Sequence, residues 1–361
     1  MIRSIFVCYL LKINKGSEWL LGENTFLALE KGSYIVTAKH QIVGDFRDGS
    51  IGQCNYKRKD GRIAVVGMFG RKTEPKNPME FRFDYLIWSM KVYALLKKRA
   101  LRRKICHINL AQVLTPIPKS VRTSQGFLFG PVGGQGPWYK VRFLPFMNKL
   151  INYVIFEWLY GAVANRISRM NVIFVHPILA ERFGGGLSKP AIQLKRAAFV
   201  EVVKKLRVIH VSRRVYFKLP DLHRKIFEDL SVLHPEFEFI VVGAGWGEVP
   251  SRQNLRFLDS LPRDDIMVLF AESKFHVNLS LELAGIVNLE AALNKCITIG
   301  AAKSGAEYLL GLSGDYIVNL YDSAASVGDI VSHVSLVIGH YDDAEAERQF
   351  EKAQQHTFVT R

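Results

Sequence analysis

Short apolar runs alternate with amphipathic segments between residues 207 and 310, and this alternation leaves the chain few possible folds. Each apolar run has the length and composition of a buried strand, and each following segment has the apolar spacing of a helix. Such an alternation builds a parallel sheet with helices on both faces. The predicted strands are Arg207–Val211, Phe237–Val242, Phe275–Leu279 and Cys296–Ile299, and the predicted helices are Leu219–Leu233, Asp264–Ala271, Val287–Leu293 and Ala306–Leu310.

The first half of the chain has a similar but less regular pattern. The whole chain, with 361 residues, is too long for one core, so two α/β domains are expected, each with a doubly wound parallel sheet. The expected domains are residues 1–200 and 201–340, and a helix in 341–361 is expected to pack back on the first. The predicted elements of the first half are strands Ile2–Leu11, Tyr34–Thr37, Ile63–Met68, Ile105–Leu110 and Val172–Val175, helices over Trp19–Glu30 and in the Phe83–Arg103 region, and a glycine-rich loop over Gly126–Trp138.

The two halves differ strongly in charge. Residues 1–207 contain 35 Lys and Arg against 12 Asp and Glu, whereas residues 208–361 contain 14 against 21. The first half is therefore expected to meet an anionic partner, such as membrane lipid, a lipid-linked phosphate or nucleic acid. No zinc-finger, OB-type or RNP-like pattern accompanies this charge, which disfavours nucleic acid.

The cysteines and the apolar segments indicate a cytoplasmic chain. The four cysteines lie far apart without a CxxC pair, which is typical of reduced thiols and gives no metal motif. Ile2–Leu11 is predicted as a buried strand rather than a leader peptide. Leu150–Ala164 is too short to span a bilayer and contains Glu157, so a core or interfacial helix is predicted there.

Two cations follow the first strand of the second domain. Open α/β sheets bind ligands at the carboxyl ends of their strands. The loop after Arg207–Val211 contains Arg213 and Lys218, which together can bind a diphosphate through charge-assisted hydrogen bonds. Taken alone, these cations are more typical of an ordinary solvated loop.

Two carboxylates follow the strand Phe275–Leu279. Glu282 lies in the loop, Gly285 at the entry of the next helix, and Glu290 just over one turn inside it. Backbone amides at a helix entry suit phosphate or sugar oxygens, and a carboxylate inside suits the hydroxyls of a ribose. The alternative is a pair of glutamates on a solvated helix face.

Together these residues resemble the retaining family-four glycosyltransferases of the GT-B fold. The family has an arginine followed by a lysine five residues later, as Arg213 and Lys218 do here. It also has two glutamates that flank a glycine turn, as Glu282 and Glu290 flank Gly285. Further similarities are Gly16-Ser17-Glu18, Cys106-His107, Phe129-Gly130-Pro131-Val132-Gly133-Gly134 and Ser304-Gly305-Ala306-Glu307.

Three residues depart from the family pattern. Ser212 replaces the glycine before the arginine, and Lys295 and Ile297 replace the glycine and proline after the second glutamate. The charged residues remain in place, whereas the backbone geometry on the donor side and the level of activity are left open.

The resemblance implies a GT-B enzyme whose two Rossmann-like domains face a cleft. It would transfer a sugar, with retention and without a metal or other cofactor, from a nucleotide diphosphate donor to a lipid-linked glycan in bacterial surface polysaccharide synthesis. The protein would lie on the inner face of the cytoplasmic membrane. The implied residues are Arg213, Lys218, Glu282 and His107 for catalysis, Ser212, Arg213, Lys218, Glu282, Gly285, Ile286 and Glu290 for the donor, and Gly16, Glu18, Gly130, Gly133 and Gly134 on the acceptor side.

A basic segment supplies the expected membrane contact. Met90–Lys104 places seven cations beside an apolar stripe if it is helical, which is the pattern of an interfacial helix. The residues expected at the lipid are Lys97, Lys98, Arg102 and Arg103. The alternative is a solvated basic helix.

Other functions remain open. A GT-B epimerase or hydrolase acting on nucleotide sugars would need the same donor site, and a non-catalytic membrane-bound partner protein is compatible with the departures at Lys295 and Ile297. Gly243-Ala-Gly245 follows a strand, but Glu248 stands where a dinucleotide fingerprint needs its third glycine.

Overall fold

The computed structural model describes residues 134–168, 172–185, 202–247, 249 and 252–358. Earlier in the chain and between these ranges it describes 4–7, 34–37, 53–58, 61–67, 84–85, 87–88, 90–91, 105–108, 127–132, 187–188 and 194–195. The chain divides into two compact units. Unit 1 is Met1–Gly134, Leu159–Lys195 and Phe358–Arg361, and unit 2 is Gln135–Trp158 and Arg196–Thr357.

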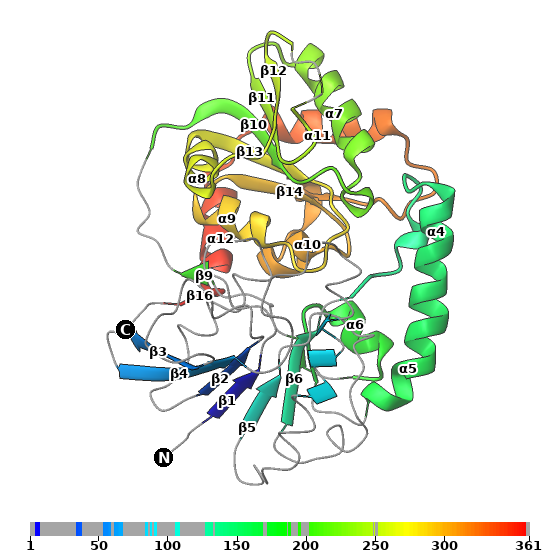
Figure 1. Cartoon of the computed structure of the whole chain (residues 1–361). Coiled ribbons are helices and arrows are strands. Elements are labelled where there is room, and N and C mark those ends of the chain that lie inside the picture. Colours follow the sequence, from blue (N-terminus) through cyan, green and yellow to red (C-terminus); the bar gives the residue numbers. More distant parts are fainter. Residues whose placement is uncertain are drawn as a thin grey trace. The chain divides into compact units, whose positions relative to one another are not determined.

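Unit 1 contains an eight-stranded sheet in the order β3-β4-β2-β1-β5-β6-β7-β8 (Figure 1). All neighbouring strands are parallel except the hairpin β3–β4. Without that hairpin strand and β8, the order is the one found in dinucleotide-binding folds. The strands are β1 Ser4–Val7, β2 Tyr34–Thr37, β3 Gln53–Arg58, β4 Gly61–Gly67, β5 Ile105–Ile108, β6 Phe127–Val132, β7 Val172–Phe174 and β8 Leu187–Ser188.

Strand β6 corrects the prediction of a loop over Gly126–Trp138. Phe127–Val132 is extended and pairs with β5 and β7 in parallel. The register with β7 shifts between Phe129 and Val132. Pro131 has no N–H to donate to a neighbouring strand, so a glycine–proline pair can stand in a sheet only at such an irregularity.

Unit 2 contains six parallel strands in the order β12-β11-β10-β13-β14-β15, which is again the dinucleotide-binding order. The strands are β10 Lys205–Val211, β11 Glu238–Val242, β12 Leu255–Leu258, β13 Ser273–Asn278, β14 Ile297–Ala301 and β15 Ile317–Val318. The helices between and after them are α7 Pro220–Leu233, α8 Arg263–Glu272, α9 Ile286–Leu293, α10 Gly305–Leu310, α11 Val327–Ile338 and α12 Asp343–Gln354.

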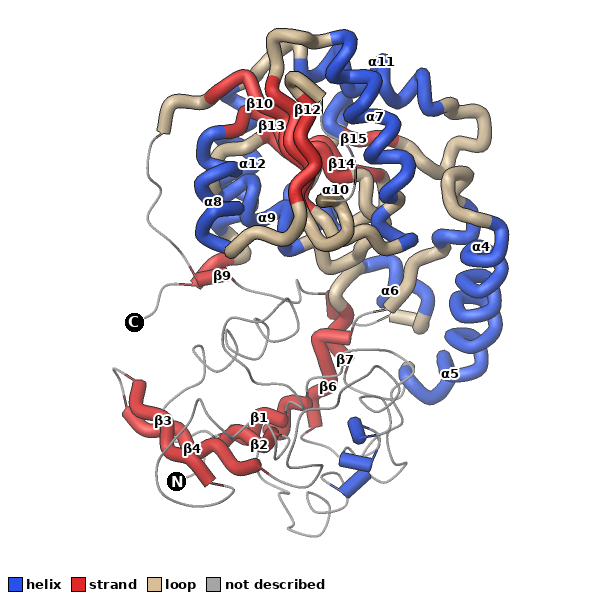
Figure 2. The backbone as a smooth tube through the Cα atoms, turned by 45° about the horizontal axis from the view of Figure 1, so that its top comes forward, coloured by secondary structure: helices blue, strands red, loops and turns tan. Residues whose placement is uncertain are grey.

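Helices cover both faces of the unit 2 sheet (Figures 1 and 2). On one face, α7 and α11 pack Ile226, Leu230 and Val334 against the strands. On the other, Phe270 of α8 and Ala291 of α9 pack against Ile209 and Ile240. The strands are buried on both sides, which explains why their sequences are continuous apolar runs rather than alternating ones.

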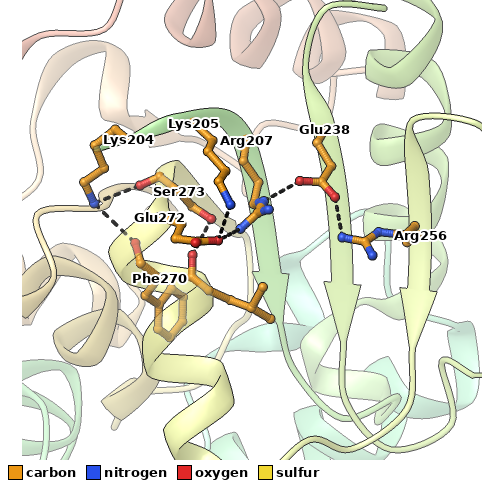
Figure 3. Close-up of polar contacts among 9 residues, drawn as sticks. Lys204, Lys205, Arg207, Glu238, Arg256, Phe270, Glu272 and Ser273 are labelled. Atoms are coloured by element: carbon orange, nitrogen blue, oxygen red, sulfur yellow. Dashed lines mark hydrogen bonds and ion pairs between the residues drawn. The ribbon is translucent and has the colours of Figure 1, made fainter. Parts of the chain in front are cut away.

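Ion pairs join the amino ends of the neighbouring strands β10, β11 and β12 (Figure 3). The buried guanidinium of Arg207 donates to Glu238 at 2.6 Å and to Glu272 at 2.8 Å. Glu238 also pairs with Arg256, and Glu272 with Lys205 at 2.8 Å. These contacts bind β10, β11, β12 and the end of α8 together at the amino ends of the strands. The expected ligand site lies at the opposite, carboxyl ends.

Two segments lie outside their predicted domain. Gln135–Trp158 belongs to unit 2, because the Trp138 ring packs in the unit 2 core and stacks on Phe217 with centroids 5.6 Å apart. The C-terminal helix was expected on the first domain, but α12 packs on unit 2. There the Gln349 side chain accepts from the Thr298 N–H at 2.8 Å and donates to the Thr298 carbonyl at 3.2 Å.

Further helical elements lie between β6 and β8. They include α4 Phe146–Tyr153, the wider π-helical turn η3 Val154–Leu159, α5 Tyr160–Ile167 and α6 Pro177–Arg182. No helix in the described parts of the chain is both long enough and apolar enough to cross a bilayer.

Candidate functional site

The central strands β10 and β13 are neighbours in the unit 2 sheet, and the chain leaves them toward opposite edges. Ligands of doubly wound sheets bind where the strand order reverses in this way. The two loops that follow these strands are joined directly, because the Leu281 N–H donates to the Phe217 carbonyl at 3.0 Å. The structure therefore brings together the two loops in which the candidate donor residues were predicted.

Lys218 and Glu282 meet at this point. The Lys218 Nζ lies 2.9 Å from Glu282 Oε2, and both side chains are partly buried. The ion pair holds a cation and a carboxylate beside each other in front of two parallel strands. A phosphate that bound Lys218 would replace Glu282 as the anionic partner of this cation.

Arg213 lies on the same loop and is exposed. Among the described residues, its guanidinium has no hydrogen-bond or ion-pair partner. Three cations therefore follow β10. Lys218 is held by Glu282 and Arg214 donates to the Gly245 carbonyl at 3.2 Å, whereas Arg213 is available to an incoming anion.

The structure has room for the Ser212 side chain, where the resembled family has a glycine. Its side chain is buried and its hydroxyl donates to His210 Nε2 at 2.6 Å, so it points into the core. Its carbonyl accepts from Trp246 Nε1 at 2.7 Å. Gly243 must be glycine here, since its φ is +142° and a Cβ would lie 2.1 Å from the Ser212 carbonyl oxygen.

Two buried histidines fix the loops, and sequence analysis did not single them out. The rings of His210 and His223 stack with centroids 3.8 Å apart. His223 Nδ1 donates to the Leu219 carbonyl at 3.0 Å, and its Nε2 accepts from the Leu279 N–H at 2.9 Å. Burial lowers the pKa of His223 to about 4, which keeps it neutral. The one indication of its burial in the sequence was that His223 lies three residues before Ile226, which belongs to the apolar stripe of α7.

The loop after β13 is held by its own side chains. The Asn278 amide accepts from the Ser280 N–H at 3.2 Å and donates to Asn288 at 2.8 Å. The Ser280 hydroxyl accepts from the Glu282 N–H at 3.1 Å. Gly285 then enters α9 with φ +52°, and a Cβ there would lie 2.8 Å from Asn288 Nδ2. These bonds fix where the Glu282 backbone lies and where Ile286 begins the helix.

Glu290 has a partner that the sequence did not predict. Arg263, the first residue of α8, donates through Nε at 3.0 Å and pairs through Nη2 at 2.8 Å with Glu290 Oε1. Burial raises the pKa of Glu290, and the neighbouring Arg263 opposes that rise. A ribose bound by Glu290 would therefore share its acceptor with, or displace, Arg263.

The departure at Lys295 leaves the backbone in a conformation that favours glycine, and Ile297 is accommodated at the start of a strand. Lys295 has φ +52°, the left-handed conformation that favours glycine. Its Nζ pairs with Glu347 at 2.5 Å and lies 5.3 Å from the centre of the Phe350 ring. Ile297 is fully buried and begins β14 opposite Phe275.

The candidates of the first half are described only in part. His107 lies in β5, in register with Phe6 of β1 and Leu128 of β6, at the point where the unit 1 strand order reverses. Gly130 lies in β6. A Cβ on Gly134 would lie 2.7 Å from the Tyr160 hydroxyl, so close packing requires this glycine.

The remaining candidates lie outside the described residues. They are Gly16, Glu18 and Gly133 on the expected acceptor side and Lys97, Lys98, Arg102 and Arg103 at the expected membrane contact. Of the basic segment predicted as a helix, Met90 and Lys91 are described, and both are helical and exposed.

Solved structures share the fold of this chain. No protein-family model and no curated protein matches the sequence. The chain is similar to α,α-trehalose-6-phosphate synthase from Burkholderia multivorans, with 11% identity, 99% of this chain and 94% of that chain covered, and a TM-score of 0.64. It is also similar to trehalose-6-phosphate synthase from E. coli bound with UDP-2-fluoro glucose (13% identity, 98% and 94% covered, TM-score 0.61) and to sucrose-phosphate synthase from Thermosynechococcus elongatus (12%, 99% and 94%, 0.61). Two Rossmann-like sheets and these neighbours show that the chain has the α/β fold of the GT-B glycosyltransferases.

Proposed function

We propose that this chain is a glycosyltransferase that takes a sugar from a nucleotide diphosphate donor bound at the carboxyl edge of the unit 2 sheet. The observation that supports this most is the meeting of Lys218 and Glu282 where the strand order reverses. A cation for the leaving diphosphate and a carboxylate for the sugar hydroxyls are the two groups that such a transfer needs side by side.

The residue roles follow from this arrangement. Lys218 and the exposed Arg213 bind the diphosphate and stabilise the charge that develops on it as the sugar leaves. Glu282 and the backbone near Gly285 and Ile286 bind the sugar, and Glu290 binds the ribose. With two cations at the phosphates, transfer proceeds without a metal, and front-face attack gives retention of configuration.

UDP-sugars are the proposed donor class. Two of the similar enzymes support this choice, since one is named as UDP-forming and another was solved with UDP-2-fluoro glucose. The test is thermal unfolding in the presence of UDP-, ADP- and GDP-sugars, with NAD as a control of similar charge. A ligand that binds the folded chain raises its melting temperature. Stabilisation by NAD alone would instead favour a dinucleotide enzyme.

The proposed acceptor is a lipid-linked glycan at the cytoplasmic face of a membrane. The strongly cationic first half supports an acceptor that carries phosphate on an anionic surface. His107, Gly16, Glu18, Gly130, Gly133 and Gly134 are the residues proposed on that side. Bacterial surface polysaccharide synthesis is the setting in which such an acceptor would be used.

A sugar phosphate is the second candidate acceptor. A similar enzyme from Burkholderia xenovorans, at 12% identity, was solved in complex with glucose-6-phosphate. The two acceptors are separated by following UDP release with soluble sugar phosphates and, in parallel, with lipid-linked glycans in vesicles. UDP release that needs no acceptor at all would indicate a nucleotide-sugar hydrolase. Epimerisation of the donor sugar would indicate an epimerase. Binding of the donor without any reaction would indicate a non-catalytic partner protein.

A further inference from the structure

Helix α4 has an inverted distribution of polar and apolar side chains, since its buried residue is Asn152, whereas the turn η3 that follows it buries Phe156. The side that faces unit 2 is polar at its centre, where the Asn152 side chain is 1% exposed. Its oxygen accepts from the Tyr139 N–H at 2.7 Å, and its nitrogen donates to Gln135 at 2.8 Å and to the Gly136 carbonyl at 3.1 Å. The helix is therefore held by hydrogen bonds to the preceding stretch of the same segment, whose Trp138 packs in the unit 2 core.

The opposite side of the same helix is apolar and exposed. Phe146 and Trp158 are 76% and 70% exposed. Residues four apart share one side of a helix, so these two lie in line with the residues between them. We call this surface the outer face of α4, and it consists of Phe146, Met147, Leu150, Ile151, Val154 and Trp158.

A surface of this kind is unusual in a protein that is surrounded only by water. Single exposed apolar side chains are common, whereas a continuous row of them, which includes two large aromatic rings, marks a contact with a partner or with lipid. The polar side chain of Asn152 points inward and bonds to Gln135 and Gly136. The outer face is therefore not the side of the helix that packs on the protein.

Charge decides between the two classes of occupant. The segment Gln135–Trp158 contains three cations, Lys140, Arg142 and Lys149. Its one carboxylate, Glu157, accepts a hydrogen bond from the Tyr139 hydroxyl at 2.6 Å. This local excess of positive charge opposes the approach of the same segment of a second copy, and it attracts the segment to an anionic lipid surface.

We propose that the outer face of α4 inserts into the headgroup region of an anionic membrane, with the helix axis along the membrane plane. Interfacial helices bind by the burial of such an apolar face together with the attraction of flanking cations to acidic lipids. Trp and Tyr side chains favour the depth of the headgroups, which suits Trp158 and the nearby Tyr153. This contact is distinct from the basic segment Met90–Lys104 and from the donor residues of unit 2.

Vesicle sedimentation of the full chain tests the proposal. The parent is expected to sediment with vesicles of phosphatidylglycerol and phosphatidylcholine and to bind phosphatidylcholine vesicles much less. The double variant Phe146→Ser/Trp158→Ser should lose most of this binding, with a partition coefficient about tenfold or more lower. The reason is that the two aromatic rings would be buried in the lipid, and such burial contributes strongly to partitioning. UDP affinity and the melting temperature, measured on the same variant, report whether unit 2 is still folded.

A matched control carries the same chemical change elsewhere on unit 2. Val232 of α7 and Leu336 of α11 are 69% and 63% exposed. The variant Val232→Ser/Leu336→Ser is expected to bind vesicles as the parent does. Equal vesicle binding of the parent and the Phe146→Ser/Trp158→Ser variant would overturn the proposal and assign the contact to another surface.

Fluorescence adds a direct measure of insertion. Acidic vesicles should shift the tryptophan emission to the blue, and lipids brominated near the headgroup should quench it, with both effects lost in Trp158→Phe. Quenching that persists in that variant would contradict insertion of the outer face. A concentration-dependent dimer in sedimentation velocity, abolished by Phe146→Ser/Trp158→Ser, would show that a second copy occupies the outer face instead.

Discussion

Lys218 Nζ lies 2.9 Å from Glu282 Oε2 and thereby joins the loops that follow the two central strands of the unit 2 sheet. The pair has a consequence for the proposed reaction. A donor diphosphate that takes Lys218 also releases Glu282, which is then able to accept hydrogen bonds from the sugar. In the proposed reaction, phosphate binding and sugar binding would be coupled through this ion pair.

The first prediction separates the two roles of this pair. In Glu282→Gln, Lys218 no longer has an anionic competitor, so UDP should bind about two- to fivefold more tightly, the equivalent of about 0.5–1 kcal/mol. Transfer of the sugar should nevertheless fall about tenfold or more, because a charged acceptor for its hydroxyls is gone. Calorimetry and steady-state kinetics measure the two effects.

Glu228→Gln is the control for that experiment. Glu228 pairs with Arg224 at 2.9 Å on α7, as Glu282 pairs with Lys218, but it lies on a helix surface rather than in the two loops. Its replacement should change neither UDP binding nor turnover. A loss of UDP affinity in Glu282→Gln would contradict the competition between Glu282 and phosphate.

The second prediction concerns pH. Burial raises the pKa of Glu290 and Arg263 opposes the rise, so Arg263→Ala should raise that pKa further. In the proposed complex the ribose hydroxyls donate to the ionised Glu290 carboxylate, so binding should be complete above its pKa and should be lost as the pH falls through it. UDP affinity measured from about pH 5 to pH 8 should therefore begin to fall at a higher pH in Arg263→Ala than in the parent.

Titration of the UDP phosphates affects parent and variant alike, so only the difference between their profiles is informative. Arg256→Ala removes a guanidinium that pairs with Glu238 at the opposite sheet edge and should leave the profile unchanged. If Arg263→Ala and the parent have the same pH profile, then Glu290 does not bind the ribose as an ionised group.

The strands of unit 2 were predictable because parallel strands with helices on both faces leave a strong pattern. The predicted strand Arg207–Val211 became β10 and the predicted helix Leu219–Leu233 became α7, with small shifts at the ends. The short strand β15 and the strand β12, whose residues alternate in burial, were not predicted. The core requires a continuous apolar run only where both faces of a strand are covered.

The site was predictable where charge and spacing determine it, and not where contacts between distant residues do. Arg213, Lys218 and Glu282 follow strands and were found from that position. Arg263 was missed because its contact with Glu290 joins residues that are distant in the sequence. The inversion of α4 was likewise hidden, since periodicity indicates an apolar stripe on a helix but does not tell whether that stripe faces the core.

The third prediction is that turnover does not need a metal. Because Arg213 and Lys218 are proposed to neutralise the leaving diphosphate, EDTA should change the rate little. Loss of activity by about tenfold, restored by magnesium or manganese, would show that a metal shares this role.

The fourth prediction concerns the basic segment. Reversal of Lys97, Lys98, Arg102 and Arg103 to glutamate should weaken binding to acidic vesicles, since each cation contributes roughly 1 kcal/mol or less near an anionic leaflet. UDP affinity should persist in this variant. High salt should weaken the binding of the parent to acidic vesicles in the same way. If the reversed variant sediments like the parent, this segment is a solvated surface.

The most direct test of the proposed donor site is the affinity for UDP of the parent, Lys218→Ala and Arg213→Ala, measured by calorimetry. Lys225→Ala is the control, because Lys225 pairs with Asp229 at 2.5 Å on the exposed side of α7. Charge-assisted contacts to phosphate contribute about 1.5–3 kcal/mol each, so Lys218→Ala should bind UDP about ten- to a hundredfold more weakly, and Lys225→Ala should bind it as the parent does. Unchanged affinity in both Lys218→Ala and Arg213→Ala would contradict the assignment of this site to the donor diphosphate.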